Sequence, residues 1–199
     1  MGSADTSRSI NFALIGHAGD GKTTLADSLL VAAGVINRLG RVDGGASFME
    51  GLPEERHRGA SSGTAICWGR GGEGGCRGVD APGDANFAGE MRGAIAASDN
   101  AVLVLNAQDG VRVGTERAYH YAREHGLGLA AVANKMDLER ADYEACAKQL
   151  EEAFGVRVVK LHLPIGRGEG FRGFVNLLTG LAHHLDANGK LVTDEPPAE

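Results

Sequence analysis

The 199-residue sequence has few cysteines, no long apolar run and no cluster of basic residues. No apolar run approaches the roughly 20 residues that a helix needs to cross a bilayer, and residues 1–10 are too polar for a secretory signal. The three cysteines are odd in number and lack paired C-x-x-C spacing, so they support neither a disulfide framework nor a zinc site. These absences predict a soluble, cytoplasmic protein that does not act at a membrane.

The charge balance is acidic, with 26 Asp and Glu residues against 20 Lys and Arg residues and a formal net charge of −6. Because the basic residues form no block, we expect this chain alone to bind nucleic acid poorly. Its length suits one domain with a full hydrophobic core. The sequence contains no internal repeat and no interdomain linker.

Apolar segments alternate with helical patterns along most of the chain, which is typical of a parallel sheet with helices on both faces. Strands are expected near residues 10–15, 65–68, 76–80, 101–106, 127–133 and 156–163. Helices are expected near residues 22–33, 87–97, 115–125 and 142–154, and a flexible hairpin loop over residues 69–75. The predicted fold is an α/β parallel sheet with helices on both faces.

The most informative motif is GHAGDGKTT, which matches the phosphate-binding pattern G-x-x-x-x-G-K-[ST] directly after an apolar run. Its members are Gly16, His17, Ala18, Gly19, Asp20, Gly21, Lys22, Thr23 and Thr24. The glycines allow backbone N–H groups to turn toward an anion, and the following helix directs its positive N-terminal end at the same point. Lys22 is predicted to contact the β and γ phosphates of a nucleotide, and Thr23 to bind Mg²⁺. A chance glycine-rich turn is the alternative.

A second motif, NKMD at residues 134–137, follows the apolar run at residues 127–133. Open α/β sheets bind ligands at the carboxyl ends of their strands. A carboxylate there can accept hydrogen bonds from N1–H and the exocyclic amine of guanine, an edge that adenine does not offer. Asp137 and Asn134 are therefore predicted to select guanine, with the aliphatic part of Lys135 on the purine ring. Without the upstream phosphate loop, the same string would indicate only a polar turn.

A third motif, DAPG, stands between the other two and fits the D-x-x-G element of nucleotide switches. It comprises Asp80, Ala81, Pro82 and Gly83. Asp80 is predicted to hold Mg²⁺ through a water molecule, and the N–H of Gly83 to contact the γ phosphate. A simple Asp-Pro-Gly turn is the alternative, which the order of the three motifs disfavours.

Together with GRVDGGASF at residues 40–48 and GVRVGTERAYHYA at residues 110–122, these motifs resemble the GTP-binding domain of bacterial elongation factor G. The similarity is closer to diverged paralogues of that factor, and it covers residues 10–180. The resemblance implies the P-loop NTPase fold, an α/β, doubly wound, mostly parallel sheet. It implies GTP and GDP as ligands, Mg²⁺ as cofactor and hydrolysis of GTP to GDP and phosphate as the reaction. It also implies the ribosome as a partner, through domains beyond this one.

The same resemblance places a first switch between residues 34 and 62. In the family, an R-G-I-T pattern in this switch provides a threonine that binds Mg²⁺ and the γ phosphate. The counterpart here is RGAS at residues 58–61, so Ser61 is the candidate hydroxyl and Ser62 lies one position away. A disordered loop that engages neither serine is the alternative.

Two departures from the family pattern bear on catalysis. Asp84 stands where translation factors carry the histidine that orients the attacking water. An ionised Asp only accepts hydrogen bonds, and its charge would repel the negative charge of the transition state. Gly19 stands where the family usually has an aspartate that helps to bind a monovalent cation. We therefore expect slow GTP hydrolysis by a site that includes Lys22, Ser61, Gly83 and Asp84; a GTP-binding switch with little or no turnover is the alternative.

The predicted organisation is a disordered tail over residues 1–9, a GTP-binding domain over residues 10–180, and a truncated inserted subdomain or flexible tail over residues 181–199. FRGFVNLL at residues 171–178 resembles the start of the subdomain that elongation factor G inserts. LDANGKLV at residues 185–192 carries the Asn-Gly signal of a tight hairpin. No Ser-Ala loop of the kind that closes the guanine pocket in this family follows Asp137.

Overall fold

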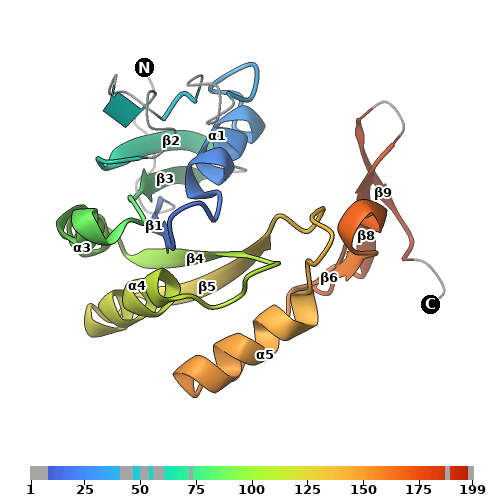
Figure 1. The fold of residues 1–199 in the computed structure, drawn as a ribbon. Coiled ribbons are helices and arrows are strands. Elements are labelled where there is room, and N and C mark those ends of the chain that lie inside the picture. Colours follow the sequence, from blue (N-terminus) through green and yellow to red (C-terminus); the bar gives the residue numbers. More distant parts are fainter. Residues whose placement is uncertain are drawn as a thin grey trace. The chain divides into compact units, whose positions relative to one another are not determined.

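The computed structural model describes residues 9–40, 47–49, 54–55, 61–71, 74–186 and 189–196. The chain divides into two compact units (Figure 1). The first comprises Met1–Leu105 and Arg112–Val132, and the second comprises Asn106–Val111 and Ala133–Glu199. The predicted N-terminal tail, apart from Ser9, and much of the predicted first switch lie outside the described residues.

The first unit is built on a five-stranded sheet with the strand order β2-β3-β1-β4-β5. Its strands are β1 (Ile10–Gly16), β2 (Ala65–Gly71), β3 (Gly74–Asp80), β4 (Asn100–Asn106) and β5 (Gly128–Asn134). β1 pairs in parallel with both β3 and β4, and β2 is an antiparallel edge strand against β3. The expected α/β fold with a mostly parallel sheet is confirmed.

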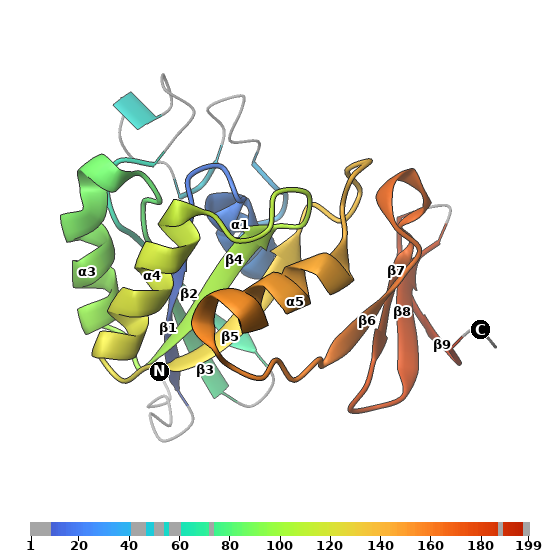
Figure 2. The same cartoon turned by 60° about the horizontal axis from the view of Figure 1, so that its bottom comes forward.

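Helices cover both faces of this sheet (Figure 2). They are α1 (Lys22–Ala32), α3 (Ala88–Ala96) and α4 (Val113–Glu124), with α1 on one face and α3 and α4 on the other. Successive side chains of a strand point to opposite faces, so Phe12 and Leu14 of β1 pack with Ala26 and Leu30 of α1. The first unit thus has the doubly wound arrangement that places loops at the carboxyl ends of its strands.

The second unit carries a separate four-stranded sheet with the order β6-β7-β8-β9, antiparallel throughout. Its elements are α5 (Tyr143–Phe154), β6 (His162–Ile165), β7 (Gly173–Asn176), β8 (Leu181–Leu185) and β9 (Leu191–Asp194). β8 and β9 pair with Leu185 opposite Leu191, so the hairpin predicted over residues 185–192 is present. A small core of Ala107, Met136, Ala141 and Cys146 lies in this unit.

The predicted strand at residues 156–163 was largely wrong, because β6 begins only at His162. The apolar side chains before it are not in a core, and Val159 is 75% exposed. The flexible loop predicted over residues 69–75 is also wrong over much of its length. β2 and β3 continue into it, and Gly69 pairs with Cys76. A Cβ atom on Gly69 would lie 2.5 Å from the Cβ of Ala33, so glycine at this point allows the sheet to approach the end of α1.

No helix in the described ranges is both long enough and apolar enough to cross a membrane. The three cysteines, Cys67, Cys76 and Cys146, are free thiols. Burial raises the pKa of Cys146 to about 11, so this thiol stays protonated near neutral pH.

Candidate nucleotide-binding site

The GHAGDGKTT motif forms the connection between β1 and α1 in the first unit. Gly21 has a φ of +91°, a left-handed conformation that favours glycine, and it directly precedes the first helical residue, Lys22. The Nζ atom of Lys22 donates a hydrogen bond to the backbone oxygen of His17 at 2.8 Å. The loop therefore curves around the lysine side chain at the N-terminus of a helix, which is the geometry that binds phosphate groups.

Lys22 is almost entirely buried, with 6% of its surface exposed. Burial lowers the pKa of its ammonium group, and the carboxylates of Asp80 and Asp20 act in the opposite direction. The lysine is thus a desolvated cation held between acidic neighbours. In such a site an anionic ligand gains more from the ammonium charge than it would at an exposed lysine.

Three oxygen-bearing side chains meet beside the loop. The hydroxyl of Thr23 donates a hydrogen bond to Oδ2 of Asp80 at 2.7 Å, and its oxygen lies 2.9 Å from Oγ of Ser61. The second candidate, Ser62, instead donates to a carboxylate oxygen of Glu55 through its backbone N–H at 2.8 Å. The structure therefore brings Ser61, and not Ser62, to Thr23.

This oxygen cluster fits a magnesium ion by the chemistry of its donors. Hydroxyl and carboxylate oxygens are the ligands that Mg²⁺ prefers, and Oδ1 of Asp80 is buried with no hydrogen-bond partner. Burial raises the pKa of Asp80 to about 6, as expected for a carboxylate removed from water. The described part of the chain contains no group of three or more His, Cys, Asp or Glu residues that could hold a metal, and the cluster here contributes one carboxylate and two hydroxyls.

The D-x-x-G element lies against the phosphate loop. The N–H of Ala81 donates to the backbone oxygen of Leu14 in β1 at 3.2 Å, which continues the strand pairing beyond β3. A Cβ atom on Gly83 would lie 2.5 Å from Nζ of Lys22 and 2.6 Å from the backbone N of Ala18. Glycine at residue 83 is thus required because a side chain there would prevent the close approach of the D-x-x-G element to the phosphate loop.

Asp84 follows this glycine and directly precedes the short 3-10 helix η3 (Ala85–Phe87). Its Oδ1 atom accepts a hydrogen bond from the backbone N–H of Asn86 at 2.9 Å. The carboxylate therefore serves as a helix cap in this structure, a role that the sequence pattern did not indicate.

The NKMD motif belongs to the second unit, where Asn134 ends β5. Lys135 has a φ of +60°, an unusual conformation for a residue with a side chain. The Met136 side chain is buried in the core of this unit, whereas Asp137 is exposed. A tight turn with a buried apolar anchor therefore presents the two polar ends of the motif.

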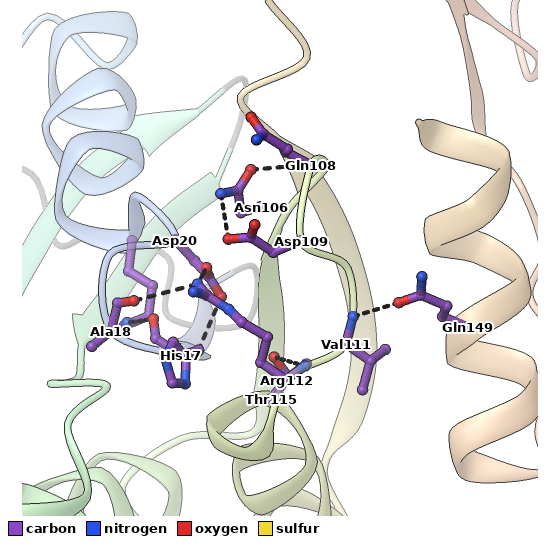
Figure 3. Close-up of polar contacts among 11 residues, drawn as sticks. His17, Ala18, Asp20, Asn106, Gln108, Asp109, Val111, Arg112, Thr115 and Gln149 are labelled. Carbon is purple, nitrogen blue, oxygen red and sulfur yellow. Dashed lines mark hydrogen bonds and ion pairs between the residues drawn. The ribbon is translucent and has the colours of Figure 1, made fainter. Parts of the chain in front are cut away.

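The loop after β4 supports this turn from within the same unit. The N–H of Ala107 donates to the oxygen of Asn134 at 2.8 Å, and the oxygen of Ala107 accepts from the N–H of Asp142 at 2.9 Å. The backbone N–H of Val111 donates to Oε1 of Gln149 on α5 at 2.9 Å (Figure 3). Backbone contacts on both sides thus hold the NKMD strand end in place.

One charged residue beside the phosphate loop was not predicted from the sequence. Arg112, directly before α4, forms an ion pair with the buried carboxylate of Asp20 (Figure 3). Its Nη2 atom also donates to the backbone oxygen of Ala18 at 3.4 Å. The available signal was the acidic residue inside GHAGDGKTT, because a buried carboxylate there requires a basic partner.

A strand–loop–helix connection with the GHAGDGKTT motif, a D-x-x-G element packed on it and an NKMD turn at a strand end occur here on the fold of a P-loop GTPase. The chain belongs to the translational GTPase family, because the family model described as the elongation factor Tu GTP binding domain matches residues 7–192. It corresponds to the GTP-binding domain of the proteins in this family.

Relatives of this chain include elongation factor G proteins. Elongation factor G of Mycoplasma genitalium is 30% identical over 192 residues, which cover 94% of this chain and 27% of that protein. Elongation factor G 1 of Treponema denticola is 32% identical, over 89% of this chain and 26% of that protein. A crystal structure from Thermus thermophilus superposes with a TM-score of 0.88 at 34% identity, over 96% of this chain and 28% of that one. The chain thus spans roughly a quarter of the length of these relatives.

Proposed function

We propose that this domain binds GTP and GDP at the loop of residues 16–24 and hydrolyses GTP to GDP and phosphate with Mg²⁺. The proposal is carried by the arrangement around Lys22, whose buried ammonium lies beside Gly83. The hydroxyl of Thr23, at the next position, contacts Asp80. A cation, a helix N-terminus and a cluster of hard oxygen ligands converge there, which is the combination that nucleoside triphosphates require.

The roles of the residues follow from their chemistry. Lys22 neutralises charge on the β and γ phosphates, and the N–H of Gly83 donates to the γ phosphate. Thr23, Ser61 and Asp80 hold the magnesium ion, directly or through water. Mg²⁺, when bound, neutralises charge on the phosphate oxygens.

Guanine selection is assigned to the NKMD turn. Asp137 accepts hydrogen bonds from N1–H and the exocyclic amine of guanine, and Asn134 contacts the opposite side of the base. The aliphatic part of Lys135 covers the purine ring. Support for this assignment comes from the exposure of Asp137 at a turn whose neighbouring Met136 is anchored in the core.

Hydrolysis is proposed to be slow. Asp84 accepts the N–H of Asn86, and as an anion it has no proton to donate to a water molecule or to a phosphate oxygen. No residue of the D-x-x-G segment therefore replaces the histidine that orients water in translation factors. A second candidate function, a GTP-dependent switch with little or no turnover, is favoured by this same aspartate.

We also propose that residues 10–180 form the GTP-binding domain and that the segment from residue 181 onward belongs to an inserted subdomain. The pairing of β8 with β9 supports an ordered structure from residue 181 onward. β8 also pairs with β7, so this sheet includes strands on both sides of the proposed boundary. We propose that the ribosome is the partner and that the protein acts in the cytoplasm. The proposed contact is made by other domains, such as those that make up the remaining length of the elongation factor G relatives.

Titration with fluorescent GDP and ADP analogues tests the binding site. We expect GDP to bind at least about tenfold more tightly than ADP, because a paired hydrogen bond to a charged acceptor is worth more than about 1.4 kcal/mol. Asp137→Ala is expected to abolish this preference by weakening GDP alone. Lys22→Ala is expected to weaken both nucleotides, because it removes the phosphate contact.

Glu139→Ala is the matched control for Asp137→Ala, since Glu139 is an exposed carboxylate two residues further along the same segment. It is expected to leave both affinities unchanged. Equal affinities for GDP and ADP in the parent would refute guanine selection. Binding of GTP by Lys22→Ala as tight as by the parent would refute the assignment of the phosphate site.

A further inference from the structure

The phosphate loop contains a carboxylate at its centre. Asp20 stands between Gly19 and Gly21, and its side chain has no exposed surface. Its Oδ2 atom accepts the backbone N–H of His17 at 3.1 Å, so the side chain is turned into its own loop. A negative charge at this point opposes the binding of phosphate groups, and the interaction is strengthened by burial.

Arg112 provides the opposite charge. It lies 92 residues after Asp20 in the sequence, and its guanidinium forms the ion pair with Asp20 and contacts the oxygen of Ala18 (Figure 3). The backbone N–H of Arg112 donates to Oγ1 of the fully buried Thr115 at 3.2 Å. The start of α4 therefore holds the arginine at a defined position.

The approach of α4 to the loop depends on a glycine. A Cβ atom on Gly114 would overlap the side chain and the Cα of His17. A close contact between the N-terminus of α4 and the phosphate loop thus positions the arginine beside the loop. An exposed pair on flexible side chains would contribute little, but here one partner is buried and the other is anchored through its backbone.

The two charges also act on Lys22 in opposite directions. Asp20 raises the pKa of the lysine and Arg112 lowers it. The three charged groups therefore interact with one another. The positive charge of Arg112 offsets the negative charge of Asp20, so the charge of Lys22 can interact with a ligand.

We infer that Arg112 is a positioning residue for nucleotide binding, which neutralises Asp20 so that the loop accepts the phosphates of GTP. The inference rests on the proposed function and deepens it. It implies a dependence on ligand charge: loss of the arginine weakens GTP more than GDP and leaves guanosine unaffected. A residue needed only for folding of the loop would not discriminate among these ligands by their charge.

The experiment measures the affinities of guanosine, GDP and GTP, with Mg²⁺, for the parent, Arg112→Gln, Asp20→Asn and the double variant. Arg112→Gln is expected to weaken GTP by roughly tenfold or more, the usual effect of losing a charge-assisted contact, and GDP by less. The double variant is expected to recover GTP affinity to within about threefold of the parent, because Asn keeps an oxygen for the N–H of His17 without the charge. Arg123→Gln, which removes an exposed charge near the other end of α4, is the matched control and is expected to change nothing.

Asp20→Asn alone keeps the test decisive if Arg112→Gln does not fold. With the carboxylate gone and the arginine present, GTP affinity is expected to rise several-fold at low salt and to depend more steeply on salt. An unchanged or lower affinity would overturn the inference. So would an equal loss for guanosine and GTP in Arg112→Gln, or the absence of any recovery in the double variant. A parent that binds neither GDP nor GTP would instead refute the proposed function, which separates the two failures.

Discussion

Substitution of Gly83 by alanine adds one methyl group at the contact between the D-x-x-G element and the phosphate loop. The new Cβ would lie 2.5 Å from Nζ of Lys22, 2.6 Å from the backbone N of Ala18 and 2.6 Å from the backbone C of His17. Real Cβ atoms do not approach other heavy atoms this closely. Only the lysine end can rotate away, so the two backbone segments must move apart.

The size of the effect follows from this geometry. Forcing an extra methyl group into a packed region typically costs about 1–3 kcal/mol. For a chain of this size, each kcal/mol lowers the melting temperature by roughly 2–4 °C. We therefore expect Gly83→Ala to lower the melting temperature by about 2–12 °C and to weaken GTP binding, because the displaced backbone includes the loop that binds phosphate.

Gly93→Ala provides the matched control. Gly93 lies inside α3, and a Cβ atom there would have no heavy atom within 4 Å. Alanine in a helix is favoured over glycine by up to about 1 kcal/mol, so this variant is expected to be slightly more stable and to bind nucleotide normally. The same chemical change is thus predicted to act with opposite sign at the two positions.

Thermal denaturation without nucleotide and titration with a fluorescent GTP analogue give the two measurements. A Gly83→Ala variant that melts at the parental temperature and binds GTP with parental affinity would refute the predicted clash. Equal destabilisation of Gly93→Ala and Gly83→Ala would also refute it, since the loss would then follow from the substitution and not from the contact.

Two further predictions concern carboxylates of the site. In a longer protein that adds the base-closing loop and the remaining domains, Asp84→His is expected to speed single-turnover GTP hydrolysis on ribosomes with little change in nucleotide affinity, because a polarising group of this kind is worth roughly 2.7–4 kcal/mol; an unchanged or lower rate would contradict the role assigned to Asp84. Because burial raises the pKa of Asp80 from 3.8 to about 6, its contribution to stability is greatest below about pH 4 and is lost as the pH rises through about 6. In EDTA, the free energy of unfolding of the parent should therefore fall between about pH 4 and pH 7 relative to Asp80→Asn; parallel pH profiles of urea denaturation would argue against it.

The motifs and most of the elements that carry them could be predicted from the sequence. The glycines and lysine of the phosphate loop, the D-x-x-G element and the NKMD turn act through local backbone conformation, which depends on residues close in the chain. The buried strands β1 and β4 were predicted for a related reason, since an apolar run between polar turns specifies a strand locally. The prediction of a strand at residues 156–163 was largely wrong, because burial, and not the apolar pattern, decides whether such a segment pairs with a neighbouring strand.

The contacts between side chains that are far apart in the sequence could not be predicted without the fold. Ser61 contacts Thr23 while Ser62 turns to Glu55, a choice that one residue of spacing cannot resolve. The pairing of Arg112 with Asp20 joins residues 92 positions apart. These contacts depend on how α4 and the switch segment approach the loop, and that approach follows from packing of the whole unit. A buried charged side chain needs a partner, and the fold determines which residue lies close enough to be that partner.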